Sequence, residues 1–282
     1  MTGKYPADLP EQVSRALRED IGTGDVTAQL ISVDAVARGR VLCREAAVIC
    51  GTAWFEETFR QLEPRIRVLW RAGDGVTVGP DTLLCEIEGP ARAILTGERT
   101  ALNFLQLLSG TATATARYVQ AVAGTGCRIL DTRKTIPGLR SAQKYAVRCG
   151  GGQNHRMGLY DRVLIKENHI AAAGSIAAAV EAARATAPGL LVEVEAEDLE
   201  EFAAALAAHC DVIMLDDFAL EHMHRAVALN RAALRPASLE ASGGVSLERI
   251  RAIAATGVDF ISVGSLTKHV QAVDLSLRLF QQ

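Results

Sequence analysis

Basic side chains gather at three places between residues 133 and 166 of this sequence. They are Arg133-Lys134, His155-Arg156 and Lys166. A single basic residue is usually a solvated surface group, but folding alone would not favour several cations held close together. An arginine guanidinium binds a carboxylate or phosphate through two parallel hydrogen bonds, and a lysine supplies a movable point charge. Brought into one pocket, these groups would bind a ligand that carries several negative charges.

Two acidic residues, Glu195 and Asp216, each end a short apolar run. Either could simply pair with a neighbouring lysine or arginine. Placed together opposite the basic groups, they would suit binding of Mg²⁺ or ribose hydroxyls, or stabilisation of a cationic transition state. The sequence leaves these roles open.

Glycine-containing turns supply a further candidate for anion binding. Ser242-Gly243-Gly244 and Val263-Gly264-Ser265 follow the last two apolar runs. In a β/α barrel the loops after the last two strands often bind phosphate through backbone N–H groups, which glycine allows to approach closely. Gly150–Gly152, just before His155, indicates either a flexible loop that carries His155 into the site or a mobile surface loop.

The elements that must position these residues alternate in type. Apolar runs at 128–131, 162–166, 191–195, 211–216, 238–244 and 259–264 predict strands, with helices expected over 141–148, 175–186, 197–208, 218–233 and 246–256. Such alternation favours parallel strands in β/α units. When these strands form a barrel, their carboxyl ends meet at one pocket. The candidate residues would then share that pocket.

The first part of the chain has a different pattern. It predicts a helix over 8–19, an antiparallel sheet from 36–50 and 66–88, and a helix over 53–62. A long helix is expected over 98–122, with a break near Ser109-Gly110. These elements indicate a β-rich, helix-containing N-terminal domain.

Composition excludes several classes of protein. The chain has 282 residues, 49% hydrophobic and 22% charged, with a net charge of −3. No global positive field is available for nucleic acid or acidic membranes, and no apolar run approaches the ~20 residues of a membrane span. Six scattered cysteines and an N-terminus without an apolar signal core favour free thiols in a cytoplasmic protein.

Several motifs, in order along nearly the whole chain, resemble the bacterial quinolinate phosphoribosyltransferase family, also called carboxylating nicotinate-nucleotide pyrophosphorylase. They are Arg18–Thr27, Glu98–Phe104, Leu108–Gly110, Asp131–Thr135 with Pro137–Arg140, Lys144–Ala146, Gly150–Arg156, Leu164–His169 and Val263–Lys268. Departures from the family pattern are small, such as Asp217 where the family often has Asn.

The resemblance implies a fold and domain boundaries. The expected fold is an N-terminal open-faced α/β sandwich over 1–112, completed by 269–282, and an incomplete TIM-like β/α barrel over 113–268. It also implies a homodimer, or a multiple of dimers, with shared active sites.

The resemblance further implies an enzyme of NAD biosynthesis that makes nicotinate mononucleotide, CO₂ and pyrophosphate from quinolinate and phosphoribosyl pyrophosphate. The implied substrate-binding residues are Arg99 from the partner subunit, Thr132, Arg133, Lys134, His155, Arg156, Lys166, Glu195 and Asp216. Of these, Lys134, Lys166, Glu195 and Asp216 are expected to be catalytic. Mg²⁺ is expected chiefly on the substrate pyrophosphate, near Glu195 and Asp216. Ser242, Gly243, Gly244, Val263, Gly264 and Ser265 would bind the 5′-phosphate.

Two other interpretations stay open. The first is another enzyme on the same scaffold, either a molybdenum-transport-associated relative or a nicotinate-type phosphoribosyltransferase. The second is a non-catalytic phosphometabolite-binding protein, which would keep the glycine turns but has no use for Glu195 and Asp216 opposite the basic residues.

Overall fold

The structure is a computed structural model that describes residues 5–280. These residues form two compact units, and each unit is built from separated stretches of the chain. The described part of the first unit comprises 5–116, 135–151 and 265–280, and the second comprises 117–134 and 152–264. The sequence placed 135–151 in the barrel domain, whereas here this stretch lies in the first unit.

An antiparallel sheet forms the centre of the first unit. Its order is β12 (Leu275–Phe280), β1 (Val36–Cys43), β5 (Thr82–Pro90) and β3 (Arg67–Trp70). A short ladder joins β2 (Ala47–Val48) to β4 (Thr77–Val78). Because β12 comes from the end of the chain, the register Val41↔Leu277 joins the two ends of the sequence in one sheet.

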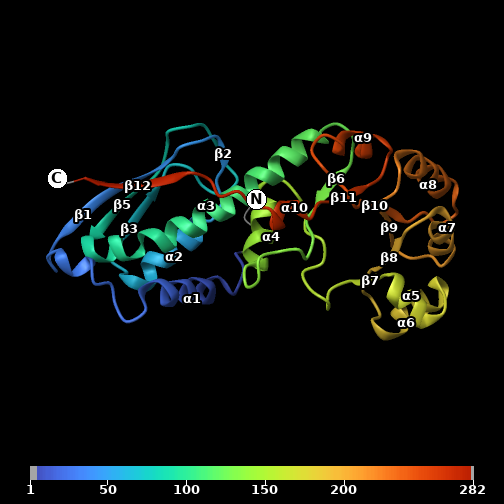
Figure 1. Cartoon of the computed structure of the whole chain (residues 1–282), viewed down its shortest axis with the longest axis horizontal. Coiled ribbons are helices and arrows are strands. Elements are labelled where there is room, and N and C mark those ends of the chain that lie inside the picture. The colour runs from blue at the N-terminus through green and yellow to red at the C-terminus, as the bar shows by residue number, and fades with distance from the viewer. Residues whose placement is uncertain (1–4, 281–282) are drawn as a thin grey trace. The chain divides into compact units, whose positions relative to one another are not determined.

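Helices cover one face of this sheet (Figure 1). Phe55 and Phe59 of α2 (Thr52–Leu62) and Ile94 and Leu105 of α3 (Ala91–Ala121) are buried against the strands. A second cluster joins α1 (Leu9–Ile21) and α4 (Arg140–Cys149) to α2 and α3 around buried Trp54. This packing explains why α4 belongs to the first unit.

Helix α3 corrects the expectation of a break near Ser109-Gly110, because it runs unbroken over 31 residues. Gly110 is buried, and a Cβ added there would lie 2.1 Å from the carbonyl oxygen of Gln271. Ser109 Oγ bonds the backbone of Cys50. The two residues thus allow close packing on the helix, and the propensity signal was misleading.

The second unit contains the six predicted strands in one parallel sheet. Their order is β6 (Arg128–Leu130), β11 (Phe260–Ser262), β10 (Ser238–Ser242), β9 (Val212–Asp216), β8 (Val192–Ala196) and β7 (Val163–Ile165). Within the described residues β6 and β7 are the two edges. The predicted α/β class, with an antiparallel sheet and a parallel β/α sheet, is therefore confirmed.

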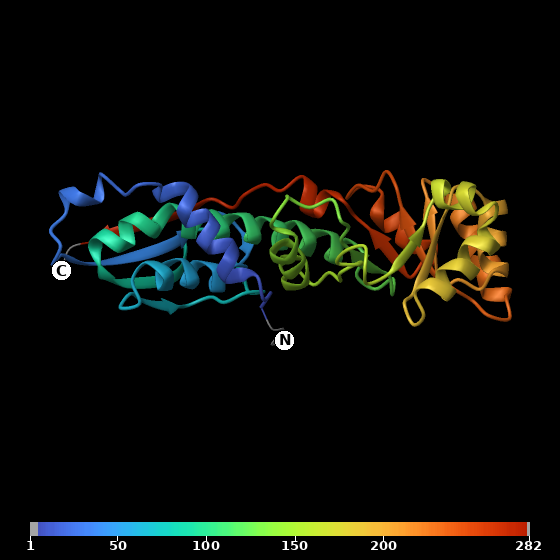
Figure 2. The same cartoon turned by 90° about the horizontal axis from the view of Figure 1, so that it is seen from below.

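Successive helices of the second unit lie next to one another along the sheet (Figure 2). They are α5 (Glu167–Ala173), α6 (Ile176–Thr186), α7 (Leu199–Ala207), α8 (Leu220–Ala232) and α9 (Ile250–Ala255). Two short helices lie in the first unit, a 3₁₀ turn at Ala28–Leu30 and α10 (Ser265–Lys268). Among residues 5–280, no helix combines the length and apolar character that crossing a bilayer requires.

Candidate active site

A cavity of about 390 Å³ opens at the carboxyl ends of the parallel strands, wholly within the second unit. Nine of the predicted site residues line it: Thr132, Arg133, Lys134, His155, Arg156, Lys166, Glu195, Asp216 and Ser242. Leu164, Met214, Glu240 and Ser262 complete the lining. The basic and the acidic residues that the sequence singled out therefore line one cavity.

Strand register explains why the acidic residues converge. In β8 and β9, Glu195 pairs with Met214, and Asp216 at the end of β9 pairs with Ser242 of β10. Side chains two residues apart on a strand project to the same face. The sheet therefore presents Met214 and Asp216 of one strand, together with Glu195 and Ser242 of its neighbours, to the cavity.

Lys166 and Glu195 form a short charged contact in the site. Lys166 follows β7, and its Nζ donates to Glu195 Oε2 at 2.5 Å. The Glu195 side chain is 10% exposed and the Lys166 side chain 42% exposed. Such a charge-assisted hydrogen bond fixes both groups at the mouth of the cavity.

The segment with His155 and Arg156 is anchored to the edge of the sheet. Fully buried Asp131 accepts from the His155 backbone N–H at 2.9 Å and from Asn154 Nδ2 at 2.5 Å. Gln153 bridges to Leu130 in the manner of a further parallel strand. The preceding Gly150 is buried, and a Cβ there would lie 2.3 Å from the Ala112 carbonyl oxygen. Gly150 thus allows close packing at the start of a stretch for which the sequence indicated a flexible or mobile loop.

Like charges lie close together in this cavity. Burial and the nearby positive charge of Arg133 lower the pKa of Arg156 from its usual value. Holding two guanidinium groups near each other costs free energy unless an anion compensates. This arrangement therefore suits a negatively charged ligand.

A buried charged layer borders the cavity, and apart from His155 the sequence did not predict it. Glu193 and Glu240 are both 0% exposed, and His155 Nε2 lies 2.9 Å from Glu193 and 3.6 Å from Glu240. Arg162 lies 3.3 Å from Glu193. Burial, followed by the charge of Glu193, raises the pKa of Glu240 well above its usual value. In the sequence, the signal for Glu193 and Glu240 was the presence of a charged residue at an interior position of a largely apolar strand.

His155 also links this layer to the backbone of Arg156. His155 Nδ1 accepts a hydrogen bond from the Arg156 backbone N–H at 2.7 Å. That bond places the ring proton on Nε2, which faces Glu193. The imidazole thus connects the buried acids to the backbone of Arg156.

The two glycine turns lie beside site residues. Gly243 has φ +85, and a Cβ there would lie 2.2 Å from Asp217 Oδ1. A Cβ at Gly264 would lie 3.0 Å from the side chain of Lys134. Gly243, Gly244, Val263 and Gly264 belong to the second unit, whereas Ser265 begins α10 in the first. Glycine is therefore required at 243 by both its backbone conformation and its surroundings.

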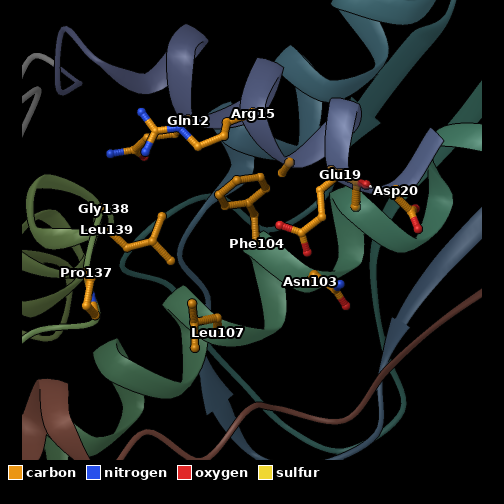
Figure 3. A pocket seen from close by; sticks show the side chains of 12 residues that line it. Gln12, Arg15, Glu19, Asp20, Asn103, Phe104, Leu107, Pro137, Gly138 and Leu139 are labelled. Carbon is orange, nitrogen blue, oxygen red and sulfur yellow. Dashed lines mark hydrogen bonds between the residues drawn. The ribbon is translucent and has the colours of Figure 1, made fainter. Parts of the chain in front are cut away.

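Arg99 is an exposed residue of α3 in the first unit. It lines a groove of about 300 Å³ with the apolar side chains of Val26 and Leu95. A separate cavity of about 330 Å³ in the same unit lies between α1, α3 and residues 137–139 (Figure 3). Phe104 and Glu19 face this second space (Figure 3). None of the predicted site residues lines it.

Sequence comparisons point to one family. Residues 25–109 match the N-terminal domain of quinolinate phosphoribosyl transferase, and residues 111–278 match its C-terminal domain. The nicotinate-nucleotide pyrophosphorylase (carboxylating) of Mycobacterium leprae is 44% identical over 277 residues, covering 95% of this chain and 96% of the relative. A probable enzyme of that name from Bacillus subtilis is 42% identical over 270 residues, covering 95% and 92%.

Solved structures agree with this assignment. The nicotinate-nucleotide pyrophosphorylase of Francisella tularensis is 47% identical with a TM-score of 0.93, covering 98% of each chain. The nicotinate-nucleotide pyrophosphorylase of Ehrlichia chaffeensis is 35% identical with a TM-score of 0.92, and the match covers 99% of this chain and 100% of the Ehrlichia chain. Human nicotinic acid phosphoribosyltransferase, at 13% identity and a TM-score of 0.67, shares the fold alone. This chain belongs to the quinolinate phosphoribosyltransferase family.

Proposed function

We propose that this chain transfers a phosphoribosyl group from phosphoribosyl pyrophosphate to the ring nitrogen of quinolinate. Loss of the 2-carboxylate then gives nicotinate mononucleotide, pyrophosphate and CO₂. The observation that carries the proposal is the cavity in which Arg133, Arg156 and Lys166 face Glu195 and Asp216. Both substrates are polyanions, and the reaction passes through a transition state with positive charge on the ribose.

The basic residues would orient the two anions. In this proposal Arg133, His155, Arg156 and Lys166 serve the quinolinate carboxylates, with His155 acting in part through the Arg156 backbone that it holds. Thr132, Lys134 and the glycine turns serve the phosphoribosyl end. Binding both substrates in line lowers the entropic part of the barrier.

The acidic residues would stabilise the charge that develops during transfer. As the pyridine nitrogen attacks the anomeric carbon and pyrophosphate leaves, the ribose gains oxocarbenium character. Glu195 and Asp216 lie on neighbouring strands facing the same space, and fixed carboxylates favour such a cation. The pyridinium product accepts the electron pair released when CO₂ departs, so the chain needs no nucleophile of its own.

Oxygen donors in the cavity fit Mg²⁺. The ion usually keeps several waters and binds one or two carboxylates together with substrate phosphates. Asp216 and Glu195 offer carboxylate oxygens, although one Glu195 oxygen already accepts from Lys166. We propose that Asp216 would be the main protein contact for Mg²⁺, which when bound would supply positive charge to offset that of the pyrophosphate.

We also propose that two copies of the chain share their active sites. Arg99 is exposed beside Val26 and Leu95, whose side chains are 78% and 37% exposed. Exposed apolar residues around a cation typify a protein–protein contact surface. In this arrangement Arg99 of one copy completes the anion-binding set of the other.

The six free cysteines suit a reducing, cytoplasmic location.

The decisive experiment compares quinolinate with nicotinate as the substrate of the purified protein. With quinolinate, phosphoribosyl pyrophosphate and Mg²⁺, we expect nicotinate mononucleotide and CO₂ in equal amounts. Turnover of nicotinate without quinolinate would instead favour a nicotinate-type enzyme on the same scaffold. Binding of phosphoribosyl pyrophosphate with no pyrophosphate release would favour a non-catalytic binding protein.

A further inference from the structure

Two cysteines and an acid meet in the first unit, outside the catalytic cavity. Cys50 lies between β2 and α2, Cys149 ends α4, and Asp74 lies between β3 and β4. The two sulfur atoms and a carboxylate oxygen of Asp74 all lie within 4.8 Å of one another. Ninety-eight residues separate the cysteines in the sequence, so only the fold pairs them.

The surroundings hold this pair in place. Ser109 Oγ bonds both the N–H and the carbonyl of Cys50, at 2.9 and 3.1 Å. Asp74 accepts from the N–H groups of Gly51 and Thr52 and from the Tyr145 hydroxyl at 2.8 Å. Both Asp74 oxygens are thus engaged, which favours chemistry between the two thiols over a metal bound by all three side chains.

The two thiols differ in environment. Cys50 is 0% exposed and Cys149 is partly exposed. Burial raises the pKa of Cys50, whereas a hydrogen bond from the Cys50 thiol lowers the pKa of Cys149. Cys149 is therefore the more accessible of the two sulfurs and the more readily ionised.

We propose that Cys50 and Cys149 form a redox-sensitive thiol pair that a peroxide converts to a disulfide. The Cys149 thiolate attacks the O–O bond, which breaks to release hydroxide and leaves a sulfenic acid. The Cys50 thiol then attacks that sulfur, so the S–S bond forms, the S–O bond breaks and water leaves. Overall the two thiols lose two electrons and two protons, and hydrogen peroxide is reduced to two waters.

The other cysteines provide the contrast. Cys43, Cys85, Cys127 and Cys210 are buried. Among residues 5–280, the one group of potential metal ligands that contains two cysteines is Cys50, Asp74 and Cys149. Burial raises the pKa of Cys127 and of Cys210 to about 12. These four thiols should react slowly with peroxide.

The test treats the full-length protein with hydrogen peroxide and follows its mass and thiol count. We expect a loss of about 2 Da and of two of the six thiols, restored by dithiothreitol. Peptide mapping should link Cys50 to Cys149. An unchanged thiol count, or a link between any other pair, would overturn the proposal.

Variants separate the two roles. Cys50→Ala removes the hydrogen bond that lowers the pKa of Cys149, so it should oxidise more slowly but accumulate a sulfenic acid at Cys149 that dimedone traps. Cys149→Ala should resist peroxide. Cys127→Ala, at another buried cysteine, should oxidise as the wild type does. Should a variant fold poorly, alkylation of the native wild type by iodoacetamide decides the matter: Cys149 is expected to react first, and a faster reaction at another cysteine contradicts the proposal.

Discussion

At the scale of single residues, the site depends on where each charge is held. Arg133 follows an edge strand and Lys166 follows the other edge strand, yet both line one cavity. Both bring positive charge to the space in which an anionic substrate would bind. Substitution at one of these positions should therefore change substrate binding more than stability.

Arg133→Ala is predicted to raise the KM for quinolinate about 10- to 100-fold, since a hydrogen bond to a charged group contributes about 1.5–3 kcal/mol. Steady-state kinetics with varied quinolinate provide the measurement. Arg128→Ala is the matched control, because Arg128 is exposed on the preceding strand and its guanidinium lies over the Phe260 ring at 4.4 Å. Normal saturation of Arg133→Ala by quinolinate would show that the carboxylate assignment is wrong.

Glu240→Gln is predicted to change how stability depends on pH. The pKa of Glu240 is raised well above 4.5 in the folded protein by burial and by Glu193. Above pH 4.5 the unfolded chain releases this proton while the folded protein keeps it. The carboxyl group therefore lowers the free energy of unfolding as pH rises above the unfolded pKa, until the folded pKa is reached.

Urea denaturation between pH 5 and 8 tests this sign. The free energy of unfolding of Glu240→Gln, relative to that of the wild type, should increase as pH increases, because glutamine does not titrate. Glu221→Gln, at an exposed position on α8, is the control and should follow the wild type. A constant difference between Glu240→Gln and the wild type across this range would contradict the prediction.

At the scale of elements, α3 shows how packing overrides local propensity. Alanine exceeds glycine in helix propensity by about 1 kcal/mol, so Gly110→Ala should stabilise an isolated helix. In the protein the added Cβ would lie 2.1 Å from a backbone oxygen of Gln271. Because a backbone must move, we predict a net loss of about 1–3 kcal/mol in the free energy of unfolding.

Chemical denaturation of Gly110→Ala measures this loss. Gly73→Ala is the control, since a Cβ there meets no atom within 4 Å and the residue has no positive φ. Wild-type stability of Gly110→Ala would mean that the chain around Gln271 is free to shift.

At the scale of the whole molecule, the proposed sharing of sites between two copies makes a quantitative prediction. With quinolinate well below the raised KM of Arg133→Ala, Arg99→Ala and Arg133→Ala should each keep only a small part of the wild-type activity when tested alone. In a mixed dimer one site has both arginines and the other has neither, so random exchange of subunits should restore about a quarter of the wild-type sites. Coexpression or mild dissociation and remixing, followed by the activity assay, gives the measurement.

The outcome distinguishes two arrangements. Recovery near a quarter supports a site built from both copies. Absence of recovery after demonstrated subunit exchange, or full activity of Arg99→Ala alone, would place Arg99 outside the site.

The sequence by itself determined the six strands of the second unit, although it did not predict α5 (Glu167–Ala173). All six apolar runs are strands, because runs of buried apolar residues between helices are a local property of the chain. Since carboxyl ends of parallel strands meet, Lys166, Glu195 and Asp216 could be expected in one cavity before any coordinates. The motifs such as Asp131–Thr135 likewise pointed to the family.

Only the tertiary structure decided the features that depend on distant neighbours. The unbroken α3, the buried layer of Glu193 and Glu240, and the pairing of Cys50 with Cys149 all arise from contacts between residues far apart in sequence. In the sequence, a glycine that allows close packing cannot be distinguished from a glycine that ends a helix. Propensity is local, whereas burial and the pKa of a carboxyl or thiol depend on what the folded chain places around it.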